Sequence, residues 1–130
     1  MNSFLKGLLI AGLTIGSAAA FAGPSVMLTH NKTDVESNAF IDGTIASPYP
    51  TRANSDGKVS WMMVKMACYG HTQGNACRAL IKMETNTTAP IDLGYVSMDV
   101  NSGAITPKKL SANGYTLTVN GPGETTLTKD

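Results

Sequence analysis

Short apolar segments separated by turn-forming residues make up most of the chain after residue 22. The segments hold β-branched and aromatic residues, and the stretches between them are rich in Gly, Pro, Asn, Asp and Ser. No convincing helical period occurs there, so the pattern is typical of antiparallel β structure. The expected strands are residues 25–29, 40–46, 58–69, 77–85, 91–100, 104–110, 115–119 and 124–129. The sequence therefore predicts an all-β fold, a single small antiparallel β-sandwich or partly open barrel of seven or eight strands.

Residues 58–69 and 77–85 predict a central hairpin whose two strands each bury an apolar face. With a period of two, the apolar set of each strand includes its cysteine, so Cys68 and Cys77 would face each other across the ladder. A slip of one residue would turn these side chains outward, so the register is well specified. The expected pairs are Cys68 with Cys77, Met66 with Ala79, Val64 with Ile81 and Met62 with Met83.

The opposite face of this hairpin is the candidate partner surface. It would carry apolar and cationic side chains, which suit a protein or a glycan if no other layer covers them. Two interpretations stay open, because a loop or a neighbouring strand could equally cover this face. The residues concerned are Trp61, Met63, Lys65 and Leu80.

Residues 1–22 have the three parts of a secretory signal peptide. Lys6 precedes an apolar run over residues 7–15, and small residues follow, ending in the A-x-A sequence of residues 20–22. The apolar run is well short of the ~20 residues that span a bilayer. We therefore expect residues 1–22 to be cleaved and residues 23–130 to form one exported domain without a membrane span.

Export changes how the charges and the cysteines are interpreted. Removal of Lys6 leaves nine Lys and Arg against nine Asp and Glu, and a neutral chain of this kind does not favour nucleic acid as a partner. In an oxidising compartment, two cysteines are most simply one disulfide. We expect the Cys68–Cys77 bond to stabilise the fold by somewhat less than ~3 kcal/mol, because the loop that it closes is short.

Catalytic and metal chemistry receive little support from the motifs. His30 and His71 are the two histidines that could act as bases, and neither lies in a recognisable catalytic motif. We therefore expect no catalytic residues and no cofactor. Two alternatives remain open: an enzyme with dispersed carboxylates, and a periplasmic Cu(I)-binding protein. The copper ligands would be Met62, Met83 and His71, since thioether sulfur suits Cu(I).

A small exported β-domain with one disulfide is similar, in a loose sense, to small substrates of bacterial secretion systems and to chaperone-assembled pilins. The resemblance implies folding in the periplasm with the disulfide formed before further export. The pilin disulfide usually encloses a much longer loop than the eight residues between Cys68 and Cys77. We expect a non-enzymatic bacterial protein, periplasmic or extracellular, that uses the export machinery and binds an unidentified macromolecule, either a protein, a glycan or an envelope component.

Overall fold

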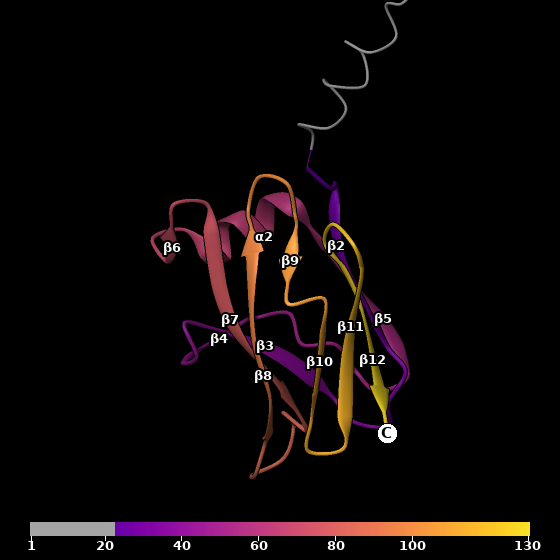
Figure 1. Ribbon diagram of the computed structural model, residues 1–130. Helices are drawn as coiled ribbons and strands as arrows, with labels where there is room; N and C mark the ends of the chain where they lie inside the picture. The colour runs from indigo at the N-terminus through magenta and orange to yellow at the C-terminus, as the bar shows by residue number, and fades with distance from the viewer. Residues whose placement is uncertain (1–22) are drawn as a thin grey trace, which may run out of the picture.

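Two β-sheets packed face to face form the part of the chain that the computed structural model describes, residues 23–130 (Figure 1). The predicted signal peptide lies outside the described residues. The first sheet has the order β10 (Lys109–Ala112), β11 (Tyr115–Gly121), β12 (Glu124–Lys129), β2 (Val26–Asn31) and β5 (Ser55–Ser60). The second has the order β4 (Ile45–Ala46), β3 (Ser37–Ile41), β7 (Ala76–Met83), β8 (Ile91–Asp99) and β9 (Ile105–Thr106), with β6 (Thr72–Gln73) paired to β7.

This architecture confirms the predicted all-β sandwich, with one change in strand direction. Among residues 23–130, eight strands have four or more residues, and β4, β6 and β9 have two each. All neighbours pair antiparallel except β12 and β2, the last strand and the first described strand, which run parallel. The antiparallel prediction was wrong for this pair, because hairpin signals report only strands that are adjacent in sequence.

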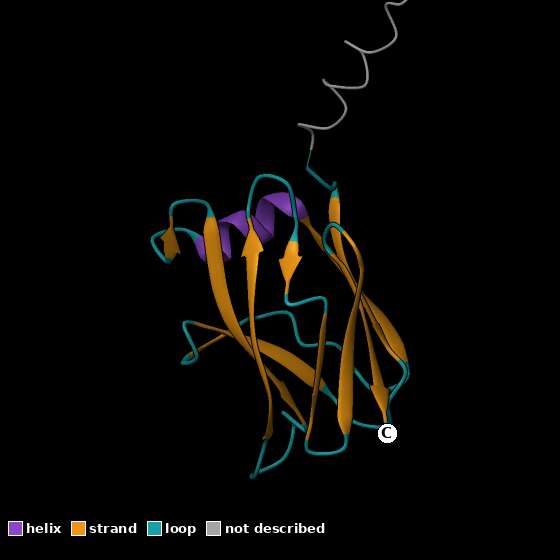
Figure 2. Ribbon diagram, viewed as in Figure 1, coloured by secondary structure: helices purple, strands orange, loops and turns teal. Residues whose placement is uncertain are grey.

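The predicted strand 58–69 is wrong beyond its first three residues, since Trp61–Cys68 forms a helix, α2. Figure 2 shows α2 lying across one end of the two sheets. The Ser60 side chain caps its start by accepting a hydrogen bond from the Met63 backbone N–H at 3.4 Å. Its end is followed by Gly70 at φ +80°, a conformation that suits glycine. Every residue of α2 except Lys65 is apolar. The sequence therefore fits the alternating pattern of a strand as well as the pattern of a helix.

The predicted hairpin register is therefore also wrong. β7 pairs with β3 on one side and β8 on the other, so it has no partner strand within residues 61–68. Cys77 lies opposite Met98 of β8 and Thr72 of β6, and Met83 lies opposite Ser37 and Ile91. The Cys68–Cys77 disulfide does form, with the two Cα atoms 5.9 Å apart, but it joins the end of α2 to β7 instead of two paired strands.

The hydrophobic core lies between the sheets, and α2 covers it at one end. Buried side chains come from both sheets and from the inner face of the helix. One side of the sandwich is closed where Leu110 of β10 packs near Gly94 of β8. The other side is crossed by residues 47–54, held to β3 by two backbone hydrogen bonds between Ser37 and Thr51 of 2.8 and 2.9 Å. Within the described residues, no helix is both long and apolar enough to cross a membrane.

Candidate interaction surface

The solvent face of α2 is lined by large apolar side chains. Met62 is 71% exposed, Met63 39% and Met66 63%, and Tyr69, the residue after the helix, is 86% exposed. Met62 and Met66 are four residues apart and Tyr69 follows three later, so these side chains lie along one face of the helix. We call these four residues the α2 ridge. Lys65, also exposed, adds a positive charge beside it.

The inner face of α2 fixes the ridge rigidly to the sandwich. Trp61, Val64 and Cys68 are buried against the core, at the spacing of one helical face. The Trp61 indole N–H donates a 2.9 Å hydrogen bond to the Val100 carbonyl at the end of β8. At the other end of the helix, the disulfide ties Cys68 to Cys77 of β7. Both ends of α2 are thus attached to the second sheet.

A helix that is apolar on both faces is unusual for a surface element. Isolated apolar residues are common on protein surfaces, but a contiguous apolar patch marks a site of interaction. A helix that is hydrophobic all round is normally covered on all sides. Because the inner face is already covered by the core, the α2 ridge is the apolar part of the helix that stays exposed.

The structure separates the four residues of the predicted partner surface. Trp61 is only 7% exposed and Leu80 is buried, so neither is available to a partner. Met63 and Lys65 do lie on the solvent side of α2. The predicted surface is corrected for this reason: in a helix, residues 61 and 63 do not share a face as they would in a strand. The spacing of residues 62, 66 and 69 is present in the sequence, but it indicates a ridge only once these residues are known to form a helix and its end.

Leu80 belongs to a second cluster, on the face of β7 that turns away from the core. It lies opposite Phe40 of β3 and Tyr95 of β8, which makes a row across three strands. The Arg78 guanidinium lies 3.6 Å from the centre of the Tyr95 ring, and Lys82 Nζ lies 4.8 Å from that of Phe40. These cations cover the ring faces that a sugar would need for stacking. The row therefore offers less open apolar surface than the α2 ridge.

The predicted copper ligands do not come together. Met62 is on the outside of α2, whereas Met83 is fully buried at the far end of β7. His71 Nδ1 lies 3.0 Å from a carboxylate oxygen of Asp42. Within residues 23–130, no group of three or more His, Cys, Asp or Glu side chains is placed to hold a metal ion. The ligand set was wrong because it depended on the hairpin register.

His30 forms a charged cluster on the outer face of the first sheet. Its Nδ1 lies 2.9 Å from Asp56 Oδ1 on β5, and its Nε2 lies 2.8 Å from Glu124 Oε2 on β12. Hydrogen bonds to Glu124 and then to Asp56 raise the pKa of His30 above 6.5. With both nitrogens engaged, the imidazole links three strands and has no nitrogen left to act as a base on a substrate.

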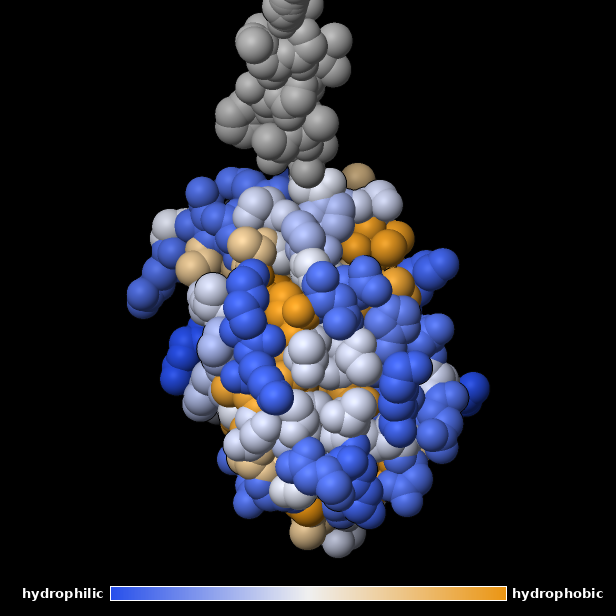
Figure 3. All heavy atoms as spheres, turned by 45° about the vertical axis from the view of Figure 1, so that its right-hand side comes forward, coloured by the Kyte–Doolittle hydropathy of each residue, from blue (hydrophilic) through white to orange (hydrophobic). Residues whose placement is uncertain are grey.

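The rest of the outer face of the first sheet is rich in threonine, and it is more polar than the α2 ridge. Figure 3, turned toward β5 and β12, shows a surface mainly of polar and intermediate hydropathy with small apolar patches. Thr116 lies opposite Thr128 and Thr118 opposite Thr126 on the paired strands β11 and β12. Thr118 is exposed and therefore marks a suitable control position for experiments on the ridge.

Comparison with known proteins places this fold in a family. The model of a family described as the T2SS substrate NttC matches residues 1–130. The crystal structure of the Legionella pneumophila type II secretion system substrate NttC matches with a TM-score of 0.82 and 58% identity, over 83% of this chain and 100% of that one. No curated protein matches the chain. The chain therefore belongs to the NttC family of type II secretion system substrates.

Proposed function

We propose that the exported domain leaves the cell through the type II secretion system and acts outside as a non-enzymatic protein that binds another protein through the α2 ridge. Family membership supports the export route. The exposure of Met62, Met66 and Tyr69 on a helix fixed at both ends supports the binding role. This exposed ridge is the observation that carries the proposal.

The composition of the ridge favours a protein partner. Methionine side chains are flexible and polarisable, so they adapt to the shape of an apolar protein surface. Tyrosine contributes a large apolar area together with a hydroxyl, and aromatic residues and methionine are enriched at protein interfaces. Lys65 beside the ridge adds a cation. The complementary surface is an apolar strip with a carboxylate near its edge.

Site-specific photo-crosslinking tests this role. A benzoylphenylalanine in place of Met66 is compared with one in place of Thr118, which is exposed on the first sheet. Both proteins are applied to host cells and to the surface of the producing bacterium. The proposal expects a discrete crosslinked protein from position 66 that is absent from position 118. The same product from both positions, or none from position 66, would contradict it.

A charge-introducing variant tests the same surface without a crosslinker. Met62→Glu combined with Met66→Glu should abolish binding of the crosslinked partner, since two carboxylates would have to move from water into an apolar contact. Both side chains are exposed, so the free energy of unfolding should change by no more than about 0.5 kcal/mol. Thr118→Glu with Thr88→Glu is the matched control, because both side chains are exposed and lie away from the ridge, and it should keep binding. Retained binding by the methionine variant would argue against the ridge as the contact surface.

A further inference from the structure

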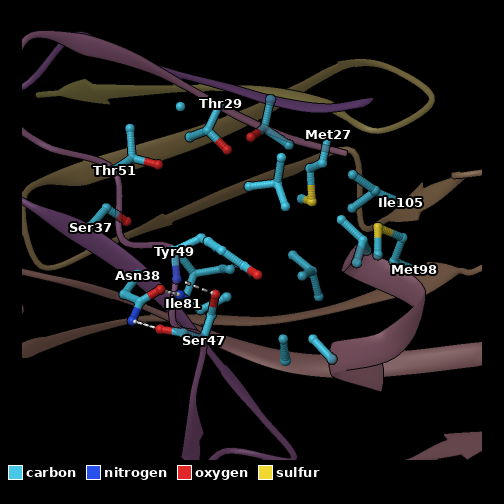
Figure 4. Close-up of a pocket in the computed structure, with 18 of the residues that line it drawn as sticks. Met27, Thr29, Ser37, Asn38, Ser47, Tyr49, Thr51, Ile81, Met98 and Ile105 are labelled. Carbon is cyan, nitrogen blue, oxygen red and sulfur yellow. Dashed lines mark hydrogen bonds between the residues drawn. The ribbon is translucent and has the colours of Figure 1, made fainter. Parts of the chain in front are cut away.

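A cavity of about 130 Å³ lies between the two sheets, beneath α2. Figure 4 shows side chains from both sheets and from the helix pointing into it. Met27 and Val59 approach from the first sheet, Ala39 and Met98 from the second, and Ala67 from α2. The sandwich interior is thus incompletely filled by the protein's own side chains.

The lining of this cavity is mainly apolar and carries no charged side chain. Its polar members are Ser37 and Asn38 on β3, Ser47, Tyr49 and Thr51 in the segment 47–51, and Thr29 and Thr125 on β2 and β12. Ser37 is already satisfied, since its hydroxyl donates to the Lys82 carbonyl at 3.0 Å. Water needs two to four polar partners to occupy a buried space, and most of this lining offers none. Apolar cavities of ~150 Å³ in proteins stay dry and accept molecules such as benzene.

The segment of residues 47–51 crosses the mouth of the cavity. The Asn38 side chain holds its start by donating a 2.8 Å hydrogen bond to the Ser47 carbonyl, and Thr51 is paired to Ser37 at its end. Between these anchors, Tyr49 stands between Pro48 and Pro50, and its side chain extends into the enclosed space (Figure 4). Tyr49 is 38% exposed, so it reaches both the cavity and the solvent.

We propose that this cavity binds an uncharged apolar group of about the size of benzene, either a small aromatic molecule or the end of an acyl chain. Three features support this occupant: the volume, the apolar lining and the absence of charged side chains among the lining residues. The ligand enters past Tyr49, and its apolar part fills the space between the sheets. Any polar group that it carries stays at the mouth, near Asn38 and Ser47. This site is separate from the α2 ridge, which occupies the opposite face of the helix.

Methionine methyl groups provide a direct test, because different methionines report on the two sites. Met27 and Met98 line the cavity, whereas Met62 and Met66 lie on the ridge. In the purified exported protein labelled with ¹³C-methyl methionine, benzene should shift the Met27 and Met98 signals saturably and leave the ridge signals in place. Shifts confined to the ridge methionines would overturn the proposal.

A series of straight-chain carboxylates of increasing length distinguishes the two kinds of ligand. Saturable shifts of Met27 and Met98 at lower concentrations of the longer acids than of benzene would identify acyl chains. Shifts with benzene alone would identify small aromatic molecules. Shifts with neither probe would contradict the site.

A cavity-filling variant tests the location. Ala39 faces the cavity, and Ala39→Leu places three extra carbon atoms there; the shifts of Met27 and Met98 on adding ligand should disappear. Ala104 is exposed and outside the lining, so Ala104→Leu is the matched control and should bind normally. Because overpacking could disturb the fold, Tyr49→Ala provides a second variant that should keep the binding site and speed ligand exchange. Normal binding by a folded Ala39→Leu protein would place the ligand elsewhere.

Discussion

At the scale of single residues, His30 couples the stability of the first sheet to pH. Its two carboxylate partners, on β12 and β5, raise its pKa above 6.5. A raised pKa means that the folded state binds the proton more tightly than the unfolded state does. The stabilisation is therefore complete below about pH 6.5, and it is lost as the pH rises through the folded-state pKa. A mildly acidic medium should make the exported protein more stable.

Thermal unfolding between about pH 5.5 and pH 8 checks this behaviour. The wild-type midpoint should fall as the pH rises, and His30→Gln should remove most of that fall. Asp99 does not contribute to the change of the unfolding midpoint over this pH range. The backbone N–H groups of Ser102 and Asn101 lower its pKa below 3.8, so its contribution changes only in stronger acid. An equal fall in wild type and variant would show that His30 is not the responsible group.

At the scale of elements, α2 depends on the disulfide at its end. The helix has eight residues, and isolated helices of this length are marginal in water. Its position is therefore set by Trp61 and Val64 in the core and by the Cys68–Cys77 bond. Loss of that bond frees the end of the helix that carries Met66 and precedes Tyr69.

Replacing Cys68 and Cys77 together by serine should lower the free energy of unfolding by about 2 to 3 kcal/mol, given the short loop that the bond closes. Denaturant unfolding measures this loss. Hydrogen exchange should show faster opening of residues 61–68 than of β7, because the sheet keeps its partners β3 and β8. A helix that exchanges as slowly in the variant as in the wild type would mean that packing alone holds it.

The sequence predicts most of the longer strands correctly, but it does not predict the helix α2. The sequence predicts β7, β8, β11 and β12 at nearly their observed positions, because alternating apolar residues mark these strands and turn residues mark their ends. Residues 61–68 predict a strand and form a helix, because only Lys65 interrupts the apolar run and such a run contains no reliable period. The disulfide pairing was correct although the register drawn from it was not, because a single bond between two segments does not require them to be neighbouring strands.

At the scale of the whole molecule, the sandwich and the single disulfide could be predicted, but the candidate sites could not. The α2 ridge follows only once the helix is known, and the cavity follows from how two sheets and a helix pack. The parallel pairing of β12 with β2 has no local signal, since the two strands come from opposite ends of the described chain. The two proposed sites use opposite faces of α2, so the fold offers a partner surface and a ligand site on one short element.

Fractionation of cultures tests whether the type II system carries this protein out of the cell. The protein is measured in the periplasm and in the culture supernatant of the producing bacterium and of a matched strain without the type II secretin. We predict that it accumulates in the supernatant of the parent, oxidised at Cys68 and Cys77, and is retained in the periplasm of the secretin mutant. Equal amounts in both supernatants, or retention in the periplasm of the parent, would show that the protein does not leave the cell by this route.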